Sequence, residues 1–94
     1  MGYNYQDGEG KHVGHGPSIG GACHMISVLE KYAGKKVYPN LHSFVETGES
    51  SSPELIKAEA ERLMAKVSDQ KVYDTLSRLA RAAAQAKGKL VVTH

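Results

Sequence analysis

The chain has 94 residues, of which 40% are hydrophobic and 23% charged, and these proportions indicate a folded domain and exclude a wholly disordered chain. Twelve basic and ten acidic side chains give a net charge of +2, far from the dense basic field that is typical of polyanion binders. No apolar run approaches the roughly 18 residues that are needed to cross a bilayer, so no membrane contact is expected.

The whole chain, 1–94, is expected to form a single small α+β domain with one modest core and no deep substrate cavity. Its only cysteine, Cys23, excludes an intramolecular disulfide and is compatible with a reducing compartment. The opening residues MGYNYQDGEG lack the apolar segment of a signal peptide. Together these features predict a cytoplasmic protein.

The first elements are a strand and a loop. Tyr3 and Tyr5 alternate with polar neighbours, which predicts a short strand over residues 2–6. Residues 7–17 contain four glycines and a proline and therefore predict a loop that is rich in Gly and His.

An amphipathic helix is expected next, over residues 18–33, with Gly34 as a left-handed C-cap. Its start is open: the helix begins either at Ser18 or after Gly21. A start at Ser18 places two glycines inside the helix, at ~1 kcal/mol each relative to Ala.

Two short elements follow. The run KKVYP indicates an edge strand that Pro39 ends. The run NLHSFVETG predicts a brief helix with Asn40 as its N-cap and Gly48 as its C-cap.

Two longer helices complete the helical part. The first begins with a capping box from Ser51 to Glu54, has Pro53 in its first turn, and places Glu59 and Arg62 on its outer face. Its apolar stripe is Ile56, Ala60, Leu63, Met64 and Val67.

The last helix is capped by Ser68 or Asp69 and ends at Gly88, and Asp74 and Arg78 have the spacing of an ion pair. Its predicted inner side is Val72, Leu76, Leu79, Ala80 and Ala83, and its predicted outer side is Lys71, Asp74, Arg78, Arg81 and Gln85.

The final run, KLVVT, is β-branched and predicts a terminal strand. The fold class is therefore α+β, with three main helices and one short helix packed on a small two- or three-stranded sheet. The sheet includes the N- and C-terminal strands, which are expected to pair with each other or with residues 36–38.

A metal site is one hypothesis for the stretch GKHVGHGPSIGGACH. His12, His15 and His24, with Cys23 as a further donor, are ligands that zinc accepts. However, the spacing matches no established zinc-finger pattern. Adjacent helical residues also diverge by ~100°, so Cys23 and His24 do not converge easily on one ion. The alternative is a buried, inert thiol and solvated histidines.

The same stretch contains residues that other chemistry uses. Cys23 could be an activated nucleophile only if the helix starts after Gly21, and no Asp or Asn is evidently placed to orient a histidine base. The run GHGPSIGG could hold an anion at a helix N-terminus, but it matches no phosphate-loop pattern. The carboxylate pairs Glu46 with Glu49 and Glu59 with Glu61 indicate solvated charge. We therefore expect no catalytic residues and a protein that is not an enzyme.

Nucleic acid is a less favoured partner. Lys71, Arg78, Arg81, Lys87 and Lys89 give the last helix a basic bias, but Asp74 interrupts it and no helix-turn-helix is evident.

A protein partner is the favoured hypothesis. Met25, Val28 and Tyr32 form a second apolar stripe on the 18–33 helix, and so wide an apolar cover predicts burial by the core or by another chain. An unpaired terminal strand could also extend a sheet across a homodimer. The predicted function is thus a small interaction or regulatory module, with metal or anion binding as the alternative.

The second half of the chain contains the runs LHSFVETGES, PELIKAEAERL and LSRLARAAAQAKGKLVV. This succession of a short helix, a Gly turn, two Ala-rich helices and a strand resembles small uncharacterised proteins of bacteria and their phages. The resemblance implies a cytosolic bacterial or phage origin and brings no catalytic residues with it.

Overall fold

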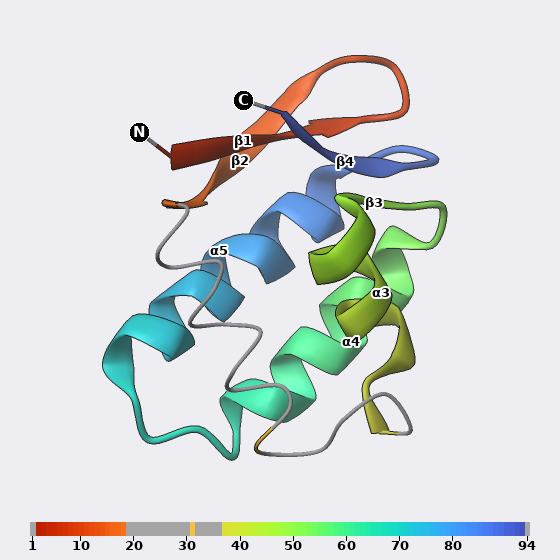
Figure 1. The fold of residues 1–94 in the computed structure, drawn as a ribbon. Helices are drawn as coiled ribbons and strands as arrows, with labels where there is room; N and C mark the ends of the chain where they lie inside the picture. Colours follow the sequence, from red (N-terminus) through yellow and green to blue (C-terminus); the bar gives the residue numbers. More distant parts are fainter. Residues whose placement is uncertain (1, 19–30, 32–36, 94) are drawn as a thin grey trace.

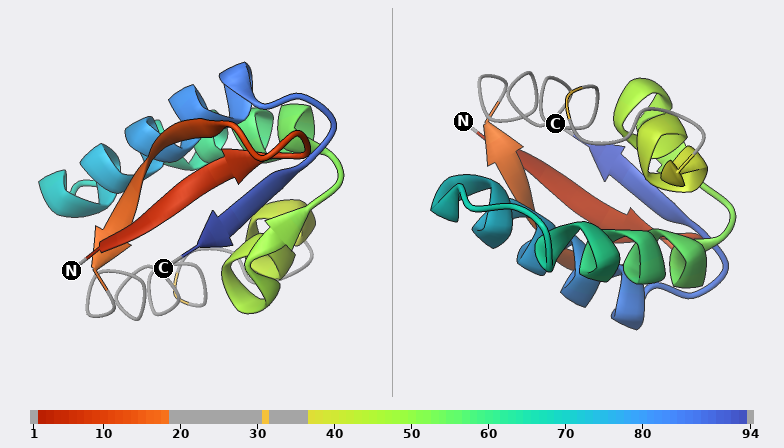
Figure 2. Two further views of the ribbon diagram at one scale, coloured as in Figure 1. Left: turned by 90° about the horizontal axis from the view of Figure 1, so that it is seen from above. Right: turned by 90° about the horizontal axis from the view of Figure 1, so that it is seen from below.

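The computed structural model describes residues 2–18, 31 and 37–93, which form an α+β fold of a sheet and a layer of helices (Figure 1). The sheet is antiparallel, with the order β2-β1-β4-β3, and its strands are β1 Gly2–Asp7, β2 His12–Ser18, β3 Glu49–Ser50 and β4 Leu90–Thr93. The described helices are α3 Pro39–Thr47, α4 Pro53–Met64 and α5 Gln70–Gln85, and all three lie on the same face of the sheet (Figure 2).

The pairing of the terminal strands is confirmed, but the expected sheet of two or three strands is too small. β1 and β4 pair antiparallel, with Tyr5 opposite Val92, and they are the two central strands of four. Both are therefore hydrogen-bonded on both sides, so the hypothesis that an unpaired terminal strand extends the sheet across a dimer is wrong.

The edge strand expected near residues 36–38 is also wrong where the structure describes it. Tyr38 is the N-cap of α3, and Pro39 starts that helix rather than ending a strand. The physical reason is that proline fits the first turn of a helix, where its missing N–H is not needed. The edge of the sheet on this side is instead the two-residue strand β3.

The loop predicted over residues 7–17 is a β-hairpin. The Asp7 carboxylate stabilises its turn, because Oδ1 accepts hydrogen bonds from the backbone N–H groups of Glu9 and Lys11, each at 2.9 Å. The two strand glycines lie where there is little room: a Cβ on Gly14 would meet the Ala82 Cβ at 3.3 Å, and one on Gly16 would meet the Tyr5 ring at 3.0 Å. These glycines therefore permit close packing, whereas a loop prediction takes them as turn residues.

The helix ends agree with the sequence in part. Gly48 is the left-handed C-cap of α3, with φ of 80°, and Asp69 caps α5 by accepting from the N–H groups of Lys71 and Val72. The capping box of α4 is wrong, because its N-cap is Ser52, without a side-chain cap hydrogen bond.

The hydrophobic core lies between the sheet and the helices. The inner side predicted for the last helix is confirmed, since all five of its residues are buried, and Ala82 is buried as well. The largest side chains with almost no exposure are Tyr38, Leu41, Ile56, Leu63, Leu76 and Leu90.

The helix predicted over 18–33 lies almost wholly outside the described residues: Ser18 is the last residue of β2, and Lys31 is helical. Whether the helix is capped by Ser18 or begins after Gly21 stays a prediction. Among the helices that the structure describes, none combines the length and the apolar character required to span a membrane.

Candidate functional site

The face of the sheet opposite the helices carries polar side chains. Tyr5 is buried in the core, so its neighbours Asn4 and Gln6 project from the other face, because successive strand residues alternate. Figure 2 shows this outer face with the described helices behind it. It is a candidate binding surface for this reason.

A register shift brings two of the predicted metal ligands to that outer face. Residues three apart in a regular strand point to opposite faces, so His12 and His15 would be separated. Here, however, Tyr5 pairs with Gly14 while Gln6 pairs with His12, which leaves Val13 as an extra residue on β2. This bulge places His12 opposite Gln6 and His15 opposite Asn4, on one face.

The two imidazoles lie next to each other on this face. Their ring centroids are 4.8 Å apart in an edge-to-face arrangement, and both side chains are exposed. His15 Nδ1 lies 3.0 Å from Asn4 Oδ1, a carbonyl oxygen that only accepts, so Nδ1 carries the proton. In the neutral form of the ring, this hydrogen bond leaves the lone pair on Nε2.

The rest of the predicted ligand set is not described. Cys23 and His24 lie outside the described residues, as do Met25, Val28 and Tyr32 of the predicted partner surface. Within residues 2–18, 31 and 37–93, no group of three His, Cys, Asp or Glu side chains could hold a metal ion.

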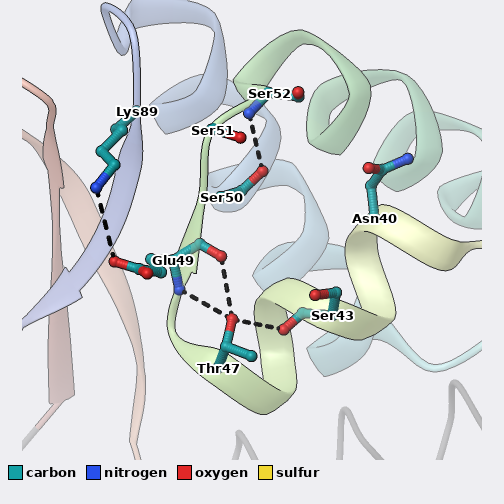
Figure 3. A pocket seen from close by; sticks show the side chains of 8 residues that line it. All are labelled: Asn40, Ser43, Thr47, Glu49, Ser50, Ser51, Ser52 and Lys89. Atoms are coloured by element: carbon teal, nitrogen blue, oxygen red, sulfur yellow. Dashed lines mark hydrogen bonds and ion pairs between the residues drawn. The ribbon is translucent and has the colours of Figure 1, made fainter.

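A polar pocket of about 340 Å³ lies between α3 and the segment that joins β3 to α4 (Figure 3). It is lined by Asn40, Ser43, Thr47, Glu49, Ser50, Ser51, Ser52 and Lys89. Several lining groups are already engaged: Thr47 Oγ1 donates to Ser43 O at 2.8 Å, and Ser50 Oγ accepts from Ser52 N at 3.1 Å. Each of these bonds lies within one segment, and the contact between segments at the pocket is the ion pair of Lys89 with Glu49 at 3.9 Å.

Glu59 is buried, with 5% exposure, so its predicted place on an outer face is wrong. Its Oε1 accepts the backbone N–H groups of Asn40 at 3.0 Å and Leu41 at 3.1 Å, and Oε2 accepts the Asn40 side-chain amide at 2.6 Å. Asn40 is therefore not an N-cap but a donor to Glu59. The carboxylate satisfies free N–H groups in the first turn of α3, which is a structural role.

Two other buried titratable groups have shifted pKa values for structural reasons. Burial raises the pKa of Tyr5 to about 12. Burial also tends to raise the pKa of Asp7, but hydrogen bonds with the backbone of Lys11, Glu9 and Lys87 outweigh it and hold that pKa below its ordinary value of 3.8. Both groups serve the core or the hairpin turn.

Charge is divided unevenly between the two helical segments. Residues 37–64, which include α3 and α4, hold two basic and five acidic side chains, a net charge of −3. Residues 65–93, which include α5, hold six basic and two acidic side chains, a net charge of +4. The overall charge of +2 conceals this separation.

The cations on α5 are free of carboxylate partners within the described residues. Lys71, Arg78 and Arg81 are exposed, as predicted, and enter none of the ion pairs found there. The predicted pair of Asp74 with Arg78 is wrong, because Asp74 Oδ1 accepts from Gln70 Nε2 at 2.9 Å. We call Lys71, Arg78 and Arg81 the basic strip of α5.

Comparisons with known proteins add no family: no protein-family model matches the chain, and no curated protein or solved structure is significantly similar to it.

Proposed function

We propose that this protein is a small, non-enzymatic interaction module that binds the phosphate backbone of a nucleic acid through the basic strip of α5. The observation that carries the proposal is the segregation of the α5 cations, which have no carboxylate partner among the described residues, from the acidic segment 37–64. The sequence disfavours nucleic acid because the net charge is small, but local charge rather than net charge determines where a polyanion binds.

The strip has a suitable shape for a linear anion. From Lys71 to Arg81 the helix rises about 15 Å. Ala82 packs against β2, and Arg78 and Lys71 precede it by about one and three turns, so these two cations lie along the β2 side of α5. Lys87, just after the C-terminal end of the helix, is a further exposed cation.

The expected binding free energy favours a polyanion over an acidic protein surface as the partner. An exposed ion pair between proteins contributes about 0–1 kcal/mol, so three or four cations alone would hold a protein partner weakly. On duplex DNA each neutralised phosphate also releases condensed counterions. Three to four such contacts predict an affinity that falls about 40- to 150-fold between 50 and 200 mM salt.

The experiment is a titration of a labelled 20-base-pair DNA duplex followed by fluorescence anisotropy at several salt concentrations. The double variant Arg78→Ala/Arg81→Ala should reduce the slope of log affinity against log salt by about 1.8. Asp74→Asn should tighten binding, because it removes the one carboxylate within the strip. The control is Lys57→Ala, which removes a cation that is paired with Glu61 at 2.9 Å on α4.

Absence of binding at 50 mM salt, or an unchanged slope in the double variant, would refute this function. Equal affinity for polyglutamate would refute the nucleic-acid assignment and indicate an acidic protein partner instead.

A protein partner or homodimer through Met25, Val28 and Tyr32 stays a separate prediction, and light scattering tests it. In the described part of the chain, the exposed large hydrophobic side chains are Val37, Leu55 and Tyr73, which lie on separate segments. In the described part of the chain, the clustered charge of α5 therefore indicates a binding surface more strongly than the scattered hydrophobic side chains do.

A further inference from the structure

We propose that His12 and His15 form an open binding site for a late first-row divalent metal ion, such as Zn²⁺, on the outer face of the sheet. The site is independent of the basic strip, because it lies on the face of the sheet that α5 does not cover. Imidazole nitrogens are good ligands for Zn²⁺, Cu²⁺ and Ni²⁺, whereas Mg²⁺ and Ca²⁺ prefer oxygen.

The separation of the rings fits one shared ion. With metal–nitrogen distances of 2.0–2.1 Å and a tetrahedral angle, two imidazole centroids on one ion lie about 5 Å apart. The observed separation is 4.8 Å. Both side chains are exposed, so the core does not restrict their rotation towards a shared ion.

Asn4 supplies the second, independent indication of metal binding. A histidine that binds a metal through one nitrogen usually donates its other N–H to an oxygen, and this bond fixes the tautomer and the ring direction. Asn4 Oδ1 is in this position relative to His15 Nδ1, at 3.0 Å. His15 is therefore held with Nε2 available as the ligand atom.

The bulge at Val13 is the third indication. Bulges often re-aim side chains next to functional sites. In this hairpin the extra residue lets Val13 enter the core, where it is 7% exposed, while both histidines remain outside. Two protein ligands leave the remaining coordination positions to water, so we expect a labile site rather than a closed structural one.

The test is a titration of tag-free protein with Zn²⁺, measured by calorimetry and by the ¹⁵N shifts of the histidine side chains. We expect one ion per chain, shifts at both His12 and His15, and coordination of His15 through Nε2. His12→Ala and His15→Ala should each weaken binding at least tenfold, and Asn4→Ala by roughly tenfold with loss of the Nε2 preference. Mg²⁺ at the same concentration should produce no shifts.

The matched control is Gln6→Ala, which alters the cross-strand neighbour of His12 without removing a ligand, and it should leave the affinity unchanged. His24→Ala tests the third ligand that the sequence predicts. Retained binding in the His12→Ala/His15→Ala double variant, loss of binding on His24→Ala alone, or no heat and no shifts in the wild type would overturn the proposal. Far-UV circular dichroism of each variant separates loss of the site from loss of the fold.

Discussion

Replacing Glu59 by alanine is the strongest test of how this small domain is held together. The Glu59 carboxylate is 5% exposed and accepts the N–H groups of Asn40 and Leu41 together with the Asn40 side-chain amide. Alanine removes the acceptor and leaves the backbone donors in the first turn of α3 without a partner, and the Leu41 donor is in a buried position. The polar contact between α4 and the first turn of α3 is lost with it.

The size of the effect follows from these contacts. Hydrogen bonds to a charged group contribute about 1.5–3 kcal/mol, and a buried donor left unsatisfied costs about 1–3 kcal/mol. Because the three bonds share one carboxylate and are not additive, we expect Glu59→Ala to lower the free energy of unfolding by about 3–4 kcal/mol. For a domain of this length that corresponds to a fall in Tm of roughly 12–25 °C.

The assay is urea unfolding followed by circular dichroism, with thermal melts for comparison. Glu61→Ala is the control, since Glu61 is exposed on the same helix and its pair with Lys57 is worth little. Glu59→Gln keeps one acceptor oxygen and should fall between the wild type and Glu59→Ala. If Glu59→Ala and Glu61→Ala differ by less than about 0.5 kcal/mol, the assigned role of the buried carboxylate is wrong.

Three further outcomes are expected. Gly16→Ala should lower the free energy of unfolding by about 1–3 kcal/mol, because its new Cβ would meet the Tyr5 ring at 3.0 Å. Gly14→Ala should cost less, because its Cβ would meet the Ala82 methyl group at 3.3 Å, and the denaturant midpoints of the two variants test this order. Gly48→Ala should cost about 1 kcal/mol, since φ is 80° at this C-cap, and a melt indistinguishable from wild type would contradict it. Burial raises the pKa of Tyr5 to about 12, so its contribution to stability is nearly complete below pH 10 and is lost as the pH rises towards 12. Relative to Tyr5→Phe, the wild type should lose about 2 kcal/mol between pH 9 and 11.5, which parallel urea titrations at pH 9, 10.5 and 11.5 will show.

Several local elements are predicted correctly because their signals are local, although the capping box at Ser51 and the N-cap at Asn40 are not. Asp69 and Gly48 are cap residues whose chemistry requires only neighbouring backbone, and the stripe from Val72 to Ala83 follows from helical spacing alone. The strand of KLVVT follows from β-branched composition. Each of these is confirmed within about two residues.

What the sequence does not predict depends on contacts between distant segments. Glu59 has the spacing of an exposed residue, and only the arrival of the α3 N-terminus, 18 or 19 residues earlier, turns it into a buried acceptor. Gly14 and Gly16 have the composition of loop residues, and only their pairing with β1 and their close approach to Ala82 and Tyr5 show that they belong to a strand. A glycine in the sequence can indicate either a flexible turn or a close approach between segments, and only the tertiary packing shows which of the two applies.

The placement of His12 and His15 on one face also depends on pairing between strands rather than on local sequence. Two histidines separated by two residues predict opposite faces of a strand, and a loop assignment predicts no relation between them. The register shift at Val13 resolves the conflict, because one extra residue makes a three-residue spacing equivalent to the two-residue spacing that keeps side chains on one face. The apolar side chain that enters the core is also the one that displaces the histidines outward, so packing of the core and placement of His12 and His15 depend on the same residue.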